Sequence, residues 1–254
     1  MGWYENAVDR WYRSRPGWKT GRAEFFEMIL AHTLGGTCLE IGPGPENTTS
    51  RWLASVFGRV DGLDIDPEAL RHPHLAAVYL YDGQSFPLPS ATYDLAVADY
   101  VLEHVAQPER FLAEVARVLK PGGRFFRTPH LWHYVSLAAR VTPRWAQSRV
   151  SAWLRRMPAG SHPSYPTYHR MNTRRTIGRL ARHAGLEVLE CRLIEKEPSY
   201  GRASPLLFYP LLAYERLVNA SDKLAMFRGN LLGTLMRAAG DAAGQPEQVR
   251  KKAA

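Results

Sequence analysis

The 254-residue sequence predicts an α/β protein of the Rossmann-like, doubly wound class, built on a mostly parallel seven-stranded sheet. Short apolar runs alternate with helical patterns along the chain, as in parallel sheets whose helices cover both faces. A glycine-rich turn follows the first apolar run, and acidic residues stand at or near the ends of the first three runs. These features favour one layered domain that binds a ligand at one edge of its sheet.

Seven segments are predicted to be strands because each is a short apolar run bounded by turn residues. They are 37–41, 59–64, 77–81, 94–98, 124–128, 186–194 and 230–236. We expect the last strand to be antiparallel to its neighbours. We also expect a helical cap to be inserted after the fifth strand, because the regular alternation stops beyond Pro129.

Helices are predicted from apolar periodicity and from capping residues. They cover 9–33 with a break near 15–17, 48–57, 108–119, 173–185 and 206–218, and, in the cap, 131–141 and 145–156. Asp66 is expected to cap a further helix with Pro67 at its first position. Residues 120–123, Lys-Pro-Gly-Gly, are expected to turn the chain into the fifth strand.

The net charge of +9 is concentrated in one stretch of the chain. Between residues 124 and 186 there are twelve arginines and no Asp, Glu or Lys, so the rest of the chain carries 9 − 12 = −3. Because guanidinium groups bind carboxylate and phosphate through paired hydrogen bonds, this stretch favours an anionic partner. The alternative is a solvated basic face that only aids solubility.

Composition narrows the class of protein further. No apolar run approaches the roughly 20 residues that span a bilayer, and the first residues lack the pattern of a secretory signal. Cys38 and Cys191 fall in predicted strands and outside any metal-ligand spacing, so we expect buried free thiols and no metal. Reduced cysteines indicate a cytoplasmic location.

Acidic residues and glycines mark the carboxyl ends of the first strands, where open parallel sheets bind their ligands. Gly42 and Gly44 allow a tight turn and a close approach of the backbone to a ligand. Glu40, just before them, suits a cationic amino-acid group and would repel a pyrophosphate. Asp64 lies 22 residues beyond Gly42, a spacing at which a carboxylate accepts hydrogen bonds from both hydroxyls of a ribose.

Two of these acidic positions have structural alternatives. After the third strand, Asp82 can accept a hydrogen bond from an adenine amino group, or it can form a turn with Gly83. Asp64 could cap the helix that follows it, but Asp66 already fills that position directly before Pro67. The ribose interpretation of Asp64 is therefore favoured.

The order of these residues resembles that of the class I S-adenosylmethionine-dependent methyltransferases, of the bacterial small-molecule type with a methyltransferase domain 11. The matching segments are 39–44, 62–65, 81–83, 86–87 with 93–94, 101–105 and 119–123. Together they cover roughly residues 37–128, and their order and spacing make the resemblance specific. The resemblance implies S-adenosylmethionine as cofactor, S-adenosylhomocysteine as product and methyl transfer as the activity.

The resemblance also implies which residues contact the cofactor. Those around its methionine end would be Glu40, Gly42, Gly44, Asp99 and Tyr100. Asp64 would bind the ribose, Ile65 would flank the adenine, and Asp82 with Gly83 would meet the adenine edge. Many relatives have a third glycine where this chain has residues 45–46, Pro-Glu, which leaves the contact of the following asparagine open.

Two other functions compete with this interpretation. A nicotinamide dinucleotide fold would need glycine at position 47, which is Asn47, and Glu40 would oppose its phosphates. A noncatalytic protein that only binds the cofactor is the second alternative, and turnover of any acceptor would exclude it. The intact acidic positions argue against the noncatalytic alternative.

Five stretches follow from this interpretation. Residues 1–34 are expected to form a helical lid, 35–129 the cofactor-binding core, and 130–172 a cap over the substrate. Residues 173–237 would complete the core, and 238–254 would be a disordered tail. We expect Trp11, Tyr12 and Trp18 of the lid to close the site from the side opposite the cap.

Catalysis and acceptor binding are expected near the cap. A hydroxyl acceptor benefits from a general base, and the candidates are the histidines near strand ends: His104, His130, His133 and His169. Each of them has a structural alternative. Candidate acceptor-binding residues are Arg155, Tyr165, Tyr168 and Arg170, because guanidinium and aromatic groups gather in this stretch.

Three classes of acceptor are compatible with the sequence. A small metabolite, sugar or natural product that carries phosphate or carboxylate and is methylated on oxygen is favoured. A lipid-linked or membrane-surface acceptor is second, because residues 206–209 are apolar and the cap is basic, although such a helix is commonly core. RNA is third and disfavoured, since the chain has no appended binding module and no Asn-Pro-Pro-Tyr sequence after strand four.

Overall fold

The computed structural model describes residues 2–32, 35–127, 149–150, 153–154 and 165–238. The predicted helix over 131–141, most of that over 145–156 and nearly all of the predicted tail lie outside these residues. The histidines at 130 and 133 and the arginine at 155 lie outside them too.

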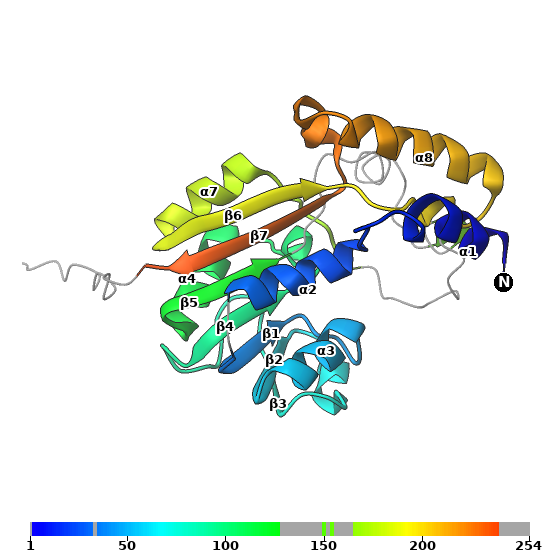
Figure 1. Ribbon diagram of the computed structural model, residues 1–254. Coiled ribbons are helices and arrows are strands. Elements are labelled where there is room, and N and C mark those ends of the chain that lie inside the picture. Colours follow the sequence, from blue (N-terminus) through cyan, green and yellow to red (C-terminus); the bar gives the residue numbers. More distant parts are fainter. Residues whose placement is uncertain (1, 33–34, 128–148, 151–152, 155–164, 239–254) are drawn as a thin grey trace, which may run out of the picture.

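A seven-stranded sheet with the order β3-β2-β1-β4-β5-β7-β6 forms the centre of the molecule (Figure 1). Its strands are β1 (Thr37–Ile41), β2 (Arg59–Asp64), β3 (Ala77–Leu80), β4 (Tyr93–Ala98), β5 (Leu119–Arg127), β6 (Leu186–Ile194) and β7 (Asn230–Arg237). Strands β1 to β5 pair in parallel, whereas β7 is antiparallel to both of its neighbours. The predicted mostly parallel sheet with an antiparallel last strand is confirmed.

The direction of winding reverses between β1 and β4, which lie side by side. From β1 the chain proceeds outward through β2 to β3, and then returns to β4 on the other side of β1. Ligands of open parallel sheets bind at such a switch point, beyond the carboxyl ends of the strands. The predicted site residues that follow β1, β2 and β4 are therefore brought to one edge.

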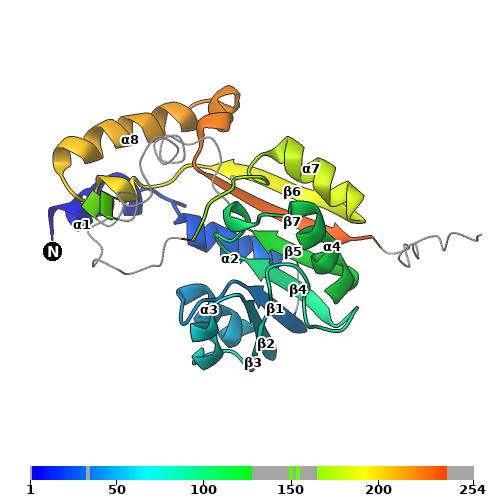
Figure 2. The same ribbon diagram turned by 180° about the vertical axis from the view of Figure 1, so that it is seen from behind.

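Helices cover both faces of the sheet. On one face, α2 (Gly21–His32) and α3 (Thr48–Val56) bury Phe25, Met28 and Leu53 against β1 and β4. On the other, α4 (Pro108–Val118) and α7 (Arg174–His183) bury an amphipathic face, and Figure 2 shows them from that side. Thr173 caps α7 as predicted, accepting a hydrogen bond from the amide of Thr176 at 3.0 Å. Among the described helices none is long and apolar enough to cross a bilayer.

Some boundaries differ from those predicted. Asp66 caps a short 3-10 helix, η2 (Pro67–Arg71), and residues 72–76 then lead into β3. Strand β5 begins at Leu119 instead of Arg124, because Tyr93 of β4 already pairs with Leu119. The predicted turn at 120–123 is an irregularity within this pairing, which resumes at Leu95 and Arg124.

A separate layer lies beyond the carboxyl end of β6. It contains α1 (Trp3–Val8), the π-helix η1 (Asp9–Arg13) and α8 (Pro205–Asn219). Tyr4, Tyr12, Phe208 and Leu212 form its small core. Figure 1 shows α1 and α8 packed together on the side toward which β6 points. The N-terminal segment thus divides in two, because α2 covers the sheet while α1 and η1 pack on α8.

Candidate active site

The turn after β1 brings the backbone close to the switch point. Gly42 and Gly44 have φ values of +72° and +62°, a conformation that side chains disfavour. The amide of Gly42 donates to the carbonyl of Leu63 at 2.8 Å, which ties the turn to β2. A Cβ on Gly42 would lie 2.5 Å from Cγ2 of Val101, whereas one on Gly44 would meet nothing within 4 Å. The turn therefore packs tightly at Gly42 and leaves space for a ligand at Gly44.

Glu40 is buried at the end of β1, just beneath this turn. Its Oε1 accepts a hydrogen bond from Nδ2 of Asn47 at 3.2 Å, and its buried Oε2 makes no hydrogen bond of good geometry among the described residues, although the Ser50 side chain is near enough to lower the pKa of the carboxyl group. Burial raises the pKa of Glu40 to about 7. An uncompensated buried carboxylate oxygen is costly, so a cationic ligand at this position would be stabilised.

Asn47 holds the turn in place, which the sequence left open. Its Nδ2 also donates to the carbonyl of Pro43 at 2.7 Å, and its Oδ1 accepts the amide of Ser50 at 2.7 Å as the cap of α3. One amide side chain thus joins Glu40, the turn and the helix. This explains how the turn is stabilised without a third glycine.

Asp64 connects the ends of β1 and β2. Its Oδ2 accepts the amide of Gly44 at 2.8 Å, and its Oδ1 accepts the amide of Asp66 at 2.9 Å. Each carboxylate oxygen has a second lone pair and can accept a further hydrogen bond from a ligand. The next residue, Ile65, exposes its side chain at the same edge.

Asp82 follows β3 and shapes its own turn. Its Oδ1 accepts the amides of Gln84 at 2.8 Å and Ser85 at 2.9 Å. Hydrogen bonds from Ser85 and then Gln84 lower the pKa of Asp82. Gly83 has a φ of +79°, as a turn requires. The structural alternative for Asp82 is thus realised through its Oδ1.

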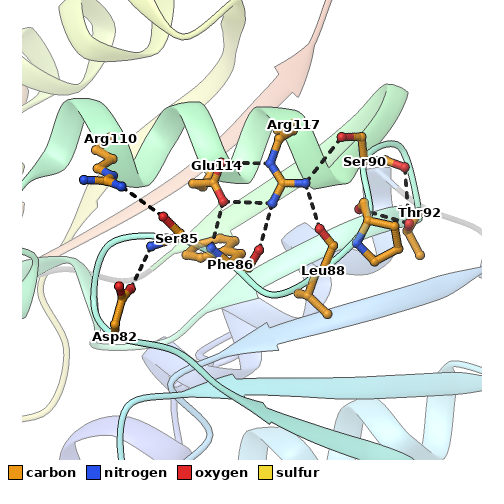
Figure 3. Close-up of polar contacts among 10 residues, drawn as sticks. Asp82, Ser85, Phe86, Leu88, Ser90, Thr92, Arg110, Glu114 and Arg117 are labelled. Carbon is orange, nitrogen blue, oxygen red and sulfur yellow. Dashed lines mark hydrogen bonds and ion pairs between the residues drawn. The ribbon is translucent and has the colours of Figure 1, made fainter.

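Three side chains of α4 fix the loop that carries this turn (Figure 3). Arg110 donates to Oγ of Ser85 at 2.9 Å, and Glu114 accepts the amide of Phe86 at 2.7 Å. Arg117 donates to the carbonyls of residues 86 and 88 and also pairs with Glu114. The position of Asp82 therefore depends on a helix more than twenty-five residues further along the chain.

The end of β4 joins the site to its neighbours on both sides. Asp99 accepts a hydrogen bond from Oγ1 of Thr49, in the first turn of α3, at 2.7 Å. Tyr100 has a φ of +56°, uncommon for a residue with a side chain, and its hydroxyl donates to Oδ1 of Asn230 at 2.6 Å. The predicted methionine-end residues thus lie where β1, α3 and β4 meet.

Glu103 is a site residue that sequence reasoning did not single out. It lies in the 3-10 helix η3 (Leu102–His104), is buried, and its Oε2 has no partner among the described residues. Burial raises the pKa of Glu103 to about 8. A carboxyl group in an otherwise apolar segment next to a predicted histidine was the signal that could have identified it.

Residues 165–170, which we call the strap, cross over η3. The amides of Tyr168 and His169 both donate to the carbonyl of Glu103, at 2.7 and 3.1 Å. Nη1 of Arg170 donates to the carbonyl of Ala106, and its guanidinium lies 5.5 Å from the ring centre of Tyr168. The strap therefore brings three of the predicted residues to the end of β4.

The strap also reaches the ends of β2 and β4 through side chains. The Tyr165 hydroxyl donates to Oδ2 of Asp66 at 2.6 Å, and this bond lowers the pKa of Asp66. Nδ1 of His104 lies 3.0 Å from the carbonyl of Pro166. Because a carbonyl only accepts, Nδ1 carries the proton and Nε2 is left with a lone pair in the neutral ring. Burial lowers the pKa of His104, which favours this neutral form.

The aromatic residues of the N-terminal segment pack in the layer around α8. Tyr12 is fully buried, and its hydroxyl donates to Oε2 of Glu215 at 3.2 Å. Trp18 lies 5.5 Å from the Tyr12 ring, and Trp11 is partly exposed. Within the described part of the chain, no cluster of His, Cys, Asp or Glu is arranged to hold a metal ion.

Comparisons with known proteins agree with this geometry. Residues 39–127 match the family model described as a methyltransferase domain. The chain is 37% identical over 109 residues to a probable S-adenosylmethionine-dependent methyltransferase of Mycolicibacterium smegmatis, covering 41% of this chain and 42% of that protein. It is 29% identical over 170 residues to a ubiquinone biosynthesis O-methyltransferase of Thiobacillus denitrificans, and this match covers 61% of this chain and 66% of that protein. The matches thus span less than two thirds of each relative.

A solved structure extends the likeness to the fold. A S-adenosylmethionine-dependent methyltransferase from Methanosarcina mazei aligns with a TM-score of 0.53 and 16% identity, covering 83% of this chain and 97% of that one. Identity at this level shows the fold alone. The family match contains the turn after β1, the aspartate that ends β2 and the loop after β4. Residues 39–127 thus carry a methyltransferase domain, and the chain is similar to S-adenosylmethionine-dependent methyltransferases in sequence over part of its length and in fold over most of it.

Proposed function

We propose that this chain transfers a methyl group from S-adenosylmethionine to an oxygen atom of a small anionic acceptor. The observation that carries the proposal is the arrangement of Glu40, Gly44 and Asp64 at the switch point. The buried Oε2 of Glu40, which makes no hydrogen bond of good geometry among the described residues, fits the cationic amino-acid end of the cofactor. Gly44 leaves open space beside it, and Asp64 has lone pairs free for ribose hydroxyls.

In this proposal the chain binds the cofactor and the acceptor, orients them toward one another and excludes water from the site. Bound S-adenosylmethionine supplies a methyl group activated by its sulfonium. Glu40 and Asp99 would hold the methionine end, Asp64 the ribose, and Ile65 with Asp82 the adenine. Alignment of two reactants in this way contributes on the order of 7 kcal/mol or more to the lowering of a barrier.

His104 is the candidate base for which the described residues offer the most support. Its Nδ1 proton is held by the carbonyl of Pro166, so Nε2 can accept a proton from an acceptor hydroxyl. His169 lies in the strap at a φ of +51°, and the histidines at 130 and 133 remain candidates. Arg170 and Tyr168, stacked on one another, are proposed to contact the anionic group of the acceptor.

The nature of the acceptor is proposed from charge and from one relative. Twelve arginines between residues 124 and 186 favour a carboxylate or phosphate group. The relative from Thiobacillus denitrificans is named an O-methyltransferase, which supports oxygen as the methylated atom. Its name also includes ubiquinone biosynthesis, so an apolar acceptor at a membrane surface is kept as the second candidate.

Calorimetry with S-adenosylhomocysteine tests cofactor binding. We expect Asp64→Ala to weaken binding by about 10- to 150-fold, since a hydrogen bond to a charged group contributes about 1.5–3 kcal/mol. Asp222→Ala, at an exposed carboxylate in the distant 3-10 helix η5 (Asp222–Phe227), is the matched control and should bind normally. Failure of the wild type to bind would overturn the proposal.

Turnover is tested with radiolabelled S-adenosylmethionine and a panel of anionic phenols, carboxylates, sugar phosphates and quinol precursors. His104→Asn keeps a donor near Pro166 but lacks the basic nitrogen, so kcat for a hydroxyl acceptor should fall about 100-fold or more while cofactor affinity stays unchanged. An unchanged kcat would remove His104 from the mechanism. Turnover of no acceptor would favour the noncatalytic alternative.

A further inference from the structure

Helix α8 presents an apolar stripe to solvent. Leu206, Pro210, Ala213 and Leu217 are all exposed and follow one another at intervals of four, three and four residues, which places them on one side of the helix. Leu206 is 85% exposed and Leu217 is 60% exposed. The opposite side is buried through Phe208 and its helical neighbours. Both sides of α8 are therefore apolar.

The two charged residues of α8 do not face outward with this stripe. Glu215 is buried and accepts hydrogen bonds from Tyr12 at 3.2 Å and from Asn219 at 2.8 Å. The guanidinium of Arg216 lies 5.0 Å from the centre of the Tyr12 ring and donates to the carbonyl of Trp11. A surface helix that faces water normally carries its charges on the outer side. The outer side of α8 is suited to an apolar partner instead.

Neighbouring residues enlarge this apolar surface. Met226 and Phe227 are exposed at the end of η5, which packs against α8. Trp153 is 65% exposed, and its neighbour Leu154 accepts a backbone hydrogen bond from Ala203, just before α8. We define the outer face of α8 as the exposed apolar and aromatic side chains of α8 and of these neighbouring segments: Trp153, Leu206, Tyr209, Leu217, Met226 and Phe227. Exposed apolar residues that gather in one part of a protein surface mark an interaction site.

Basic residues flank the outer face at both ends of α8. Arg202 is exposed just before α8, with its guanidinium 4.8 Å from the ring centre of Tyr4, and Lys223 is exposed just after α8. The exposed acid beside them, Asp222, is paired with Arg228 at 3.2 Å. Basic groups at both ends of an apolar helix complement the anionic headgroups of a bilayer, and the whole chain carries a net charge of +9.

We propose that the outer face of α8 docks on an anionic lipid surface. Leu206, Leu217 and the aromatic side chains would enter the apolar boundary, while Arg202 and Lys223 would meet headgroup phosphates. Because α8 lies beyond the carboxyl end of β6, docking would hold the acceptor side of the sheet near the bilayer (Figure 1). The inference does not depend on methyl transfer, so the two proposals can fail separately.

Co-sedimentation with vesicles of phosphatidylcholine, with and without phosphatidylglycerol, tests the docking surface. The wild type should bind only the vesicles that contain phosphatidylglycerol, and Leu206→Glu and Leu217→Glu should each weaken partitioning by about tenfold or more. Leu70→Glu is the matched control, because Leu70 is 54% exposed in η2, at the β3 side of the sheet. Thermal melts by circular dichroism would show that all three variants are folded.

Each other outcome would contradict the proposal. A wild type that ignores phosphatidylglycerol vesicles would overturn it directly. Binding that is lost in high salt but survives both leucine substitutions would place the contact on arginines elsewhere. If the wild type is a dimer that Leu206→Glu makes monomeric, and vesicles are not bound, the outer face is an interface between two copies of this chain.

Discussion

At the scale of single residues, Glu40 links cofactor affinity to pH. Its pKa is raised to about 7 by burial, so near pH 6 most molecules carry the neutral acid, which cannot pair with an ammonium group. We expect affinity for S-adenosylhomocysteine in calorimetry to be about tenfold weaker at pH 6 than at pH 8. Glu40→Gln should bind weakly at both pH values and lose this dependence. A pH-independent wild type would contradict the assignment.

The Glu40 carboxyl group also makes stability depend on pH, but the free energy of unfolding falls with rising pH whereas cofactor affinity rises. Its pKa is raised from the ordinary value of 4.5, so between pH 4.5 and 7 the folded chain holds a proton that the unfolded chain releases. The free energy of unfolding should therefore fall by about 3 kcal/mol as the pH rises through this range. Thermal melts should show Glu40→Gln to be more stable than the wild type at pH 8 and equal to it near pH 5.

Gly42 and Gly44 should respond differently to the same substitution. Gly42→Ala places a methyl group against Val101 in addition to straining the backbone, so it should lower stability by about 2–4 kcal/mol. Gly44→Ala meets only the strain, about 1–2 kcal/mol, and its methyl group should instead obstruct the cofactor. Denaturant titration and calorimetry separate these effects. Val101→Ala should restore part of the loss in Gly42→Ala, and additive effects would contradict the contact.

Residue types at strand ends could be anticipated because their chemistry is local. The glycine conformations follow from the turn, and the position of Asp64 follows from its place at the end of β2. The roles of Glu103 and Asn47 could not be predicted from the sequence, because they depend on burial and on contacts between separate elements. Asp82 shows most clearly what the sequence could not predict, since its Oδ1 accepts hydrogen bonds within a turn that α4 holds in place.

At the scale of elements, the strap should control how fast the cofactor leaves. Tyr165 binds Asp66, two residues beyond Asp64, so the strap reaches the end of the site where the adenosine is proposed to bind. Tyr165→Phe removes this exposed hydrogen bond and should speed S-adenosylhomocysteine dissociation about two- to fivefold in stopped-flow fluorescence. Tyr209→Phe, on the outer face of α8, is the control. Equal rates in all three proteins would contradict the prediction.

The strands were predictable because buried parallel strands read as short apolar runs, and the antiparallel last strand was confirmed. Elements whose boundaries depend on contacts with another part of the chain could not be predicted in the same way. Strand β5 starts early because Leu119 pairs with Tyr93 of β4, and η2 is short because the backbone becomes extended at His72. Helix α1 lies before the helical pattern that the sequence predicts from residue 9, and the π-helical form of η1 within that pattern was not predicted.

At the scale of the whole molecule, positive charge and the proposed cofactor site are separated. Exposed arginines 174, 175, 179 and 182 line α7, whereas the acidic residues Glu40 and Asp64 are buried. Salt screens exposed charges far more than buried ones. Between about 0.05 and 0.5 M salt, we therefore expect the Michaelis constant of an anionic acceptor to rise about three- to tenfold, with little change in S-adenosylhomocysteine affinity. Parallel changes in both constants would contradict this separation.

The contact between Tyr12 and Glu215 joins residues 203 positions apart in the chain. During synthesis, the ribosome adds about 5–20 residues per second, so the aromatic residues of α1 and η1 wait about 10–40 s for their partners on α8. The strands from β1 to β5 can pair within that time, because their contacts are closer in sequence. The cofactor end of a nascent chain would then assemble first, leaving the α1 aromatics as the segment in need of a chaperone.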